Sequence, residues 1–221
     1  MPAGIRAVRW RQRASGVIVS SVTVVTALST PDAGKTAAVL ARGFQNDPML
    51  VHVVPDADDR LHQLPRFLGA VQRYCLRYGE VVTTSDLGGV ACWLKPGATT
   101  LTYPQMLRTR LLPAVLMLGP AAVGRLSRLM GAMEALHHQV VPSDHWYLWL
   151  LATEPARVRQ GIGGALMRPV LARADAAGHP VYLETHLEAN VRFYGRHGFD
   201  MVGDDVVDGL RVWGLRRLPG T

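Results

Sequence analysis

Residues 159–165 read Arg-Gln-Gly-Ile-Gly-Gly-Ala, a glycine-rich turn between a strand-like run and a helix-like run. The aromatic and aliphatic run 145–153 predicts the strand, and apolar residues at four-residue spacing over 162–174 predict the helix. Glycines let a ligand come close to the backbone, and the first N–H groups of a helix have no partner within it. The turn therefore predicts an anion site suited to a pyrophosphate, with a purely structural tight turn as the alternative.

The segments after this turn complete a strand-helix-strand unit. Residues 180–185 predict a strand, 189–197 a short helix, and 200–202 and 210–215 two further β segments. A strand-helix-strand unit in one sheet forms a right-handed parallel crossover. Pro169 falls inside the predicted helix and predicts a kink there.

The first part of the chain predicts antiparallel strands and several helices. A strand is expected over 17–27, and Thr30 is the expected N-cap of a helix that runs to about residue 43. A second helix over 59–78 has Leu61 on its apolar stripe, and strands over 80–84 and 89–94 form a hairpin. Helices are expected over 103–117 and 121–138. Together the elements predict an α/β protein with a mixed, mostly antiparallel sheet.

Composition excludes several classes of protein. The 221 residues are 48% hydrophobic and 19% charged with net charge +7, so a disordered chain is excluded. The two cysteines, Cys75 and Cys92, are expected to be reduced core residues of a cytoplasmic protein. The apolar stretch 111–123 is interrupted by prolines and too short to span a bilayer, so no membrane partner is expected. Residues 1–16 predict a flexible basic arm, and 17–221 a single domain.

A resemblance to a known family rests on two motifs in this order. The turn, with Pro155 ahead of it and residues 189–199 behind it, resembles the GNAT superfamily of acetyl-CoA-dependent N-acetyltransferases. The Met-Arg-Pro-Val-Leu run 167–171 and the Tyr-Leu-Glu-Thr run 182–185 are similar to those of the actinobacterial group that includes puromycin N-acetyltransferase. The resemblance covers about residues 145–217. It implies a GNAT-type central sheet with flanking helices and a splayed pair of parallel strands.

The resemblance also implies a place for acetyl-CoA, the cosubstrate. Its pantetheine would lie between the splayed strands, and its pyrophosphate on the turn, where Val158 departs from the family's Arg or Gln. Arg157 or Arg159 is expected to substitute for that side chain. The implied contacts with the cosubstrate are Leu151, Ala152, Thr153, Arg157, Arg159, Gln160, Gly161, Ile162, Gly163, Gly164, Ala165 and Asn190.

Two residues match the catalytic roles that the resemblance implies. Tyr194 matches the general acid that protonates the departing thiolate, and core packing is its alternative role. Glu184 is the best candidate for the base that takes a proton from the amine; a salt-bridged carboxylate is its alternative, and His186 or a water chain are other bases. Tyr147 and Trp149 share one strand face and either line the acceptor pocket or belong to the core.

These observations predict an enzyme that moves acetyl from acetyl-CoA to a primary amine of a small molecule by direct attack. The alternative is a non-catalytic acyl-CoA-binding sensor or partner module on the same fold. No nucleic-acid partner is expected, because the Arg-rich arm lacks interleaved aromatic residues. No metal is expected either, because no Cys or carboxylate completes a site with His137, His138 and His145. A homodimer is left open.

Overall fold

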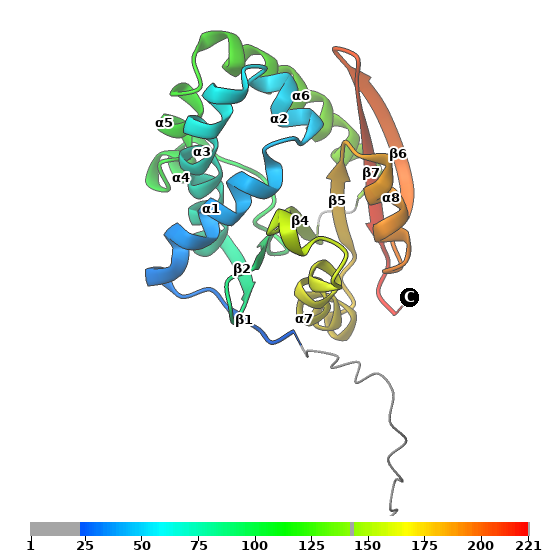
Figure 1. Ribbon diagram of the computed structural model, residues 1–221. Coiled ribbons are helices and arrows are strands. Elements are labelled where there is room, and N and C mark those ends of the chain that lie inside the picture. The colour runs from blue at the N-terminus through cyan, green and yellow to red at the C-terminus, as the bar shows by residue number, and fades with distance from the viewer. Residues whose placement is uncertain (1–22, 142–143, 221) are drawn as a thin grey trace, which may run out of the picture.

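The computed structural model describes residues 23–141 and 144–220, which share one seven-stranded sheet (Figure 1). The strand order is β1-β2-β3-β4-β5-β7-β6, and all neighbours are antiparallel except β4 and β5. The predicted α/β fold with a mostly antiparallel sheet and one parallel pair is therefore confirmed. The predicted arm over 1–16 lies outside the described residues. The strands are β1 (Val25–Ala27), β2 (Gly79–Thr84), β3 (Gly89–Leu94), β4 (Trp146–Thr153), β5 (Val181–Thr185), β6 (Asp200–Val207) and β7 (Leu210–Arg217).

The helices cover both faces of the sheet. One buried cluster joins side chains of α1, α2, α3, α5 and α6 to one face, and a second joins α7 and α8 to the other. Figure 1 shows α1 to α6 gathered together and α7 apart from them. Cys75 and Cys92 are buried and not in a disulfide. The helices are α1 (Ala33–Phe44), α2 (Pro48–Val53), α3 (Ala57–Tyr78), α4 (Tyr103–Arg108), α5 (Leu111–Leu116), α6 (Pro120–Val140), α7 (Ile162–Ala177) and α8 (Glu188–Gly195).

The parallel strands β4 and β5 pair over only two positions. Trp146 is opposite Val181 and Tyr147 is opposite Tyr182, and beyond these the strands separate. β4 nevertheless continues to Thr153, where it is still paired with Gly89 of β3 on its other edge. The side of β4 that faces β5 is thus left without a strand partner over most of its length.

A β-bulge in β4 changes which way its side chains point. Trp93 of β3 is opposite Leu148, but the adjacent Cys92 is opposite Leu150, so Trp149 is the extra residue. Trp149 and Leu150 therefore both contact the core on the α1–α6 side, although neighbouring strand residues ordinarily face opposite sides. Trp149 lies beside Tyr147, with ring centroids 6.4 Å apart, as ordinary strand alternation predicts, and the bulge adds Leu150 to the same side.

Several predicted elements were wrong in detail. The helix expected over 103–117 is two short helices, because Arg110 adopts a left-handed conformation with φ of 59°. Helix α2 was not predicted, although Asp47 caps it and Pro48 begins it. Thr30 opens a 3-10 turn rather than α1, whose N-cap is Asp32. Leu61, expected on a buried stripe, is 58% exposed.

Two other predictions met mixed outcomes. Pro169 lies inside α7, which is one element from Ile162 to Ala177, and the kink expected there stays a prediction. Of the strand expected over 17–27, the described part is β1, which covers Val25–Ala27, and the part before residue 23 lies outside the described residues.

Candidate active site

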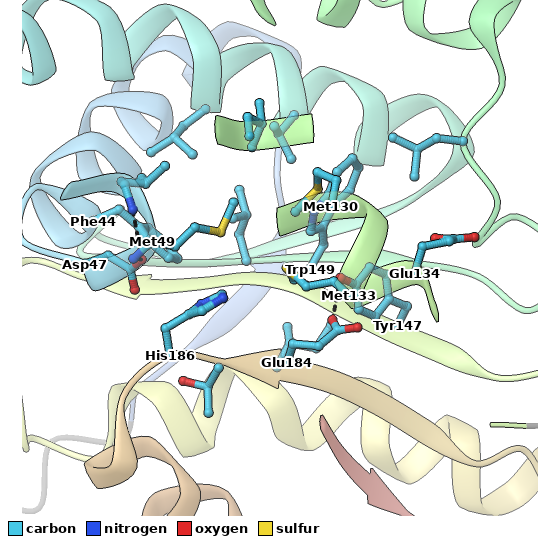
Figure 2. Close-up of a pocket in the computed structure, with 18 of the residues that line it drawn as sticks. Phe44, Asp47, Met49, Met130, Met133, Glu134, Tyr147, Trp149, Glu184 and His186 are labelled. Carbon is cyan, nitrogen blue, oxygen red and sulfur yellow. Dashed lines mark hydrogen bonds between the residues drawn. The ribbon is translucent and has the colours of Figure 1, made fainter. Parts of the chain in front are cut away.

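A cavity of about 480 Å³ lies where β4 and β5 separate. Five consecutive β4 residues, 147–151, line it together with residues 184–186 at the end of β5 and with Asn190 and Tyr194 of α8. Figure 2 shows helices above it and the two strands below it. The cavity therefore brings Tyr147, Trp149, Glu184, Asn190 and Tyr194 together, although they lie on three different elements.

Glu184 is a carboxylate held in apolar surroundings. It is partly exposed, and it lines the cavity. Burial raises its pKa to about 7, although the Tyr147 hydroxyl, which donates to Glu184 Oε2 at 2.7 Å, opposes the rise by stabilising the charged form. A group that titrates near neutral pH is suited to accept and release a proton there.

Tyr194 is buried at the same cavity and keeps its proton. Burial raises the pKa of its hydroxyl, and the nearby charge of Asp47 raises it further. Its ring packs edge-on against Phe199 at 5.7 Å between centroids, so the residue also contributes to the core. One turn earlier on α8, Asn190 donates through Nδ2 to Thr185 Oγ1 at 3.0 Å, which fixes the orientation of its amide.

His186 and Asp47 are further polar groups of the cavity. Both lie at the left of the view in Figure 2. Burial lowers the pKa of His186 to about 4, and among the described residues no group bonds to its Nε2. Its imidazole is thus a weaker base than Glu184 at neutral pH. Burial raises the pKa of Asp47 to about 6, although its Oδ1 accepts from the amides of Met49 and Leu50. No local sequence pattern pointed to Asp47 as a cavity residue.

Each glycine of the glycine-rich turn is favoured for a different structural reason. Gly161 precedes α7 with φ of 79°, which side chains with a Cβ rarely adopt, and the space around it is open. A Cβ on Gly163 would lie 3.1 Å from the Phe193 ring, and one on Gly164 would lie 2.7 Å from the His197 ring. The turn therefore leaves its entrance free, and the start of α7 packs closely against Phe193 of α8 and against His197, which follows α8.

The charged residues of the turn differ in their surroundings. Arg157 donates to Asp86 in the β2–β3 loop at 2.7 Å and so is already paired. Arg159 is exposed with φ of 67°, and Gln160 is also exposed. Ile162 is buried under the sheet, while Ala165 lies one turn into α7 and donates its amide to the Gly161 carbonyl at 3.1 Å. Arg159 is thus the arginine of this turn without an ion pair among the described residues.

No metal site is expected at His137, His138 and His145. Two of them, His137 and His145, are in contact with each other. Ring nitrogens of His137 and His145 lie 2.7 Å apart, and burial lowers the pKa of His137 to about 4. His138 is instead paired with Glu134 at 2.8 Å. Within residues 23–141 and 144–220, no three histidines, cysteines or carboxylates form a group able to hold a metal ion.

Comparisons with known proteins give the same fold. An acetyltransferase from Corynebacterium glutamicum, described as histone acetyltransferase HPA2 and related acetyltransferase, aligns over 90% of this chain and 97% of its own, with 21% identity and a TM-score of 0.63. Arylalkylamine N-acetyltransferase 2 from Aedes aegypti aligns over 88% and 97%, with 12% identity and a TM-score of 0.60. Residues 102–199 match the Acetyltransferase (GNAT) family. The chain has the GNAT fold.

The GNAT match includes the glycine-rich turn, Glu184 and Tyr194, which lie within residues 102–199, but not the cavity residues of α2 and α3. An uncharacterized N-acetyltransferase of Schizosaccharomyces pombe is 25% identical over 175 residues, which are 76% of this chain and 70% of that protein. These findings show similarity to acetyltransferases of the GNAT family over residues 102–199 and to N-acetyltransferases of the same fold over most of the chain. Within the described part of the chain, no helix has the length and apolar character needed to cross a membrane.

Proposed function

We propose that this protein transfers an acetyl group from acetyl-CoA to a primary amine of a small molecule. The observation that carries the proposal is Glu184, a carboxyl group with a pKa of about 7 at the point where the two parallel strands separate. A base of this strength can take a proton from an attacking ammonium or amine near neutral pH. Tyr194, on the same cavity, retains a proton to donate.

The reaction follows from these positions. The amine nitrogen attacks the thioester carbonyl carbon, the new C–N bond forms as the C–S bond breaks, and the products are an amide and coenzyme A. Glu184 accepts the proton that the amine loses, and Tyr194 supplies a proton to the departing thiolate. A backbone N–H on the open edge of β4 would stabilise the negative charge that develops on the carbonyl oxygen.

The binding of acetyl-CoA is assigned to the open edge of β4 and to the turn. Leu151, Ala152 and Thr153 lie beyond the last β4–β5 pair, so their backbone groups on that edge have no strand partner. The N-terminus of α7 offers free N–H groups behind the open space at Gly161, and Arg159 supplies a positive charge beside it. This arrangement is suited to a pyrophosphate.

Two structural neighbours support a small-molecule acceptor. One is the arylalkylamine enzyme of Aedes aegypti, and the other is a Drosophila melanogaster polyamine N-acetyltransferase that catalyzes the formation of N-acetylagmatine. The latter aligns over 89% of this chain and 100% of its own, with 14% identity and a TM-score of 0.58. Our proposal includes the closer similarity to the puromycin N-acetyltransferase-like group, a single domain over 17–221 and a cytoplasmic location.

The test is the release of coenzyme A thiol from acetyl-CoA by the purified protein with a panel of primary amines. We expect release that depends on both the amine and Glu184. Calorimetry with coenzyme A, run in parallel, separates catalysis from binding. Coenzyme A binding without thiol release for any amine would replace the enzyme by the acyl-CoA-binding sensor, and the absence of binding would remove both.

A further inference from the structure

The cavity above Glu184 has an apolar roof. We use this name for the side chains that α2, α3, α4 and α5 contribute to the cavity. All of them are apolar: Met49, Leu50, Phe67, Leu68, Val71, Met106, Leu111 and Val115. Next to the roof, helix α6 adds the apolar Leu126, Met130 and Met133 and also the polar Ser127, Glu134 and His137. In Figure 2, Met49 and Met130 lie on the helix side of the cavity, and Glu184 and His186 lie on the strand side.

The three carboxylates of this cavity differ in their hydrogen-bond donors and ion pairs. Asp47 accepts from the amides of Met49 and Leu50, and Glu134 is exposed and paired with His138 at 2.8 Å. Glu184 has a hydroxyl donor, Tyr147, and lies where β4 and β5 separate; like Asp47, it has no ion pair among the described residues. The roof has no charged side chain, so an acceptor whose amine lies at Glu184 and whose body extends along the roof meets an apolar surface there.

From this arrangement we infer that the acceptor is a monoamine with an extended apolar body, which the roof encloses while the amine lies at Glu184. The inference rests on the proposed function and names its substrate class. A second ammonium group at the far end of the acceptor would lie against the roof without a partner, which is costly for a charge. The methionines on both sides adapt to different shapes, so alkyl and aryl bodies are both accommodated.

Linear amines with and without a second charge provide the experiment. With acetyl-CoA, kcat/KM is measured by thiol release for butylamine, hexylamine and octylamine and for the diamines of equal length. We expect kcat/KM to rise about fourfold per methylene in the monoamine series, the gain that burial of each CH₂ gives. Octylamine should exceed 1,8-diaminooctane by at least about a hundredfold, because the second ammonium group is desolvated without a partner.

A pair of variants at one position tests the role of the apolar surface. Met130→Glu places a carboxylate beside the roof, and Met130→Gln places an uncharged group of similar size there. We expect both variants to lose the preference for octylamine and only Met130→Glu to improve 1,8-diaminooctane, by about tenfold or more as a paired charge becomes available. Leu116→Glu on α5, where Leu116 is 60% exposed and outside the cavity, is the control and should leave both series unchanged.

The outcomes separate this inference from the proposed function. If diamines match or exceed monoamines, or if chain length has no effect, the apolar acceptor is wrong while acetyl transfer stands. If no amine of either series releases thiol, acetyl transfer itself is wrong. If Met130→Glu fails to fold, as judged by circular dichroism, the two amine series on the unmodified protein and the Met130→Gln variant still decide the question.

Discussion

The Tyr147 hydroxyl donates a 2.7 Å hydrogen bond to Oε2 of Glu184 from the neighbouring strand. Tyr147 belongs to one of the two residue pairs that join β4 to β5, and Glu184 lies two residues past Tyr182, the partner of Tyr147. The bond thus spans the point at which the strands begin to separate. It holds the carboxylate at the mouth of the gap and opposes the rise in pKa that burial causes.

Replacing the proposed base should abolish most of the activity. For Glu184→Gln we expect kcat/KM to fall by about a hundredfold or more, the usual contribution of a general base. The unmodified enzyme should gain activity as the pH rises through about 7, because Glu184 must lose its proton to act. The variant should lack that limb of the pH profile. A variant with full activity and an unchanged profile would assign the base to another group, with His186 the next candidate.

The hydrogen bond from Tyr147 to Glu184 should determine the pH at which the activity rises. Tyr147→Phe removes a donor that stabilises the charged carboxylate, so the acid limb should move to higher pH by about one unit. The measurement is kcat/KM against pH for the two proteins. At pH 9, where Glu184 is ionised in both, their rates should converge. A uniform loss of activity at all pH values would instead point to packing alone.

The carboxyl group of Glu184 should also lower the free energy of unfolding at high pH. Its pKa is about 7 in the folded protein and 4.5 in the unfolded chain, so between these values the folded state holds a proton that the unfolded state has released. Stability therefore falls as the pH rises through this window, by up to about 3 kcal/mol. In denaturant titrations, Glu184→Gln should be more stable than the unmodified protein at pH 8 and similar to it at pH 4. Equal stability of the two proteins at pH 8 would contradict the raised pKa.

Tyr194→Phe separates proton donation from packing. Phenylalanine keeps the ring that contacts Phe199 and removes the hydroxyl. We expect kcat to fall by about a hundredfold, with KM for acetyl-CoA changed by less than about threefold, because the lost interaction belongs to the departing thiolate. Steady-state kinetics give both values. Retention of kcat would leave Tyr194 as a core residue only.

The two glycines at the ends of α7 form a matched pair. Gly161 and Gly178 have φ of 79° and 70°, and both have open space where a Cβ would lie. Alanine at either position should cost about 1–2 kcal/mol of stability through backbone strain. Only Gly161→Ala should also weaken coenzyme A binding by calorimetry, because it disturbs the turn assigned to the pyrophosphate. Equal affinities in the two variants would remove the turn from the binding site.

The order of strands and helices could be predicted from the sequence because it depends on local patterns. Alternating and four-residue periodicities predicted β2, β3 and α3 to within two residues at each end, and they predicted the start of α7. The break at Arg110 could not be predicted, since a left-handed arginine carries no composition signal. Helix α2 was missed although its signal was present, because an Asp-Pro pair before six residues is equally typical of a loop.

Of the candidate site, the part formed by β5, α8 and the glycine-rich turn could be predicted from the sequence, and the roof could not. Glu184, Tyr194 and the glycine-rich turn belong to motifs with fixed spacing, so a resemblance locates them. The bulge at Trp149 depends on the register against Cys92 and Trp93, which only the folded sheet defines. The roof draws on four helices that lie between residues 48 and 116, and its members share no spacing in the chain.

This division between roof and strands separates two properties that evolution can alter. The groups assigned to bond making lie on β5 and α8, whereas α2 to α5 decide what body fits above them. A substitution in one of those four helices can exchange one acceptor for another without moving a proton donor or acceptor. New acceptor preferences are therefore within reach of single changes, and drift among related genes should concentrate there.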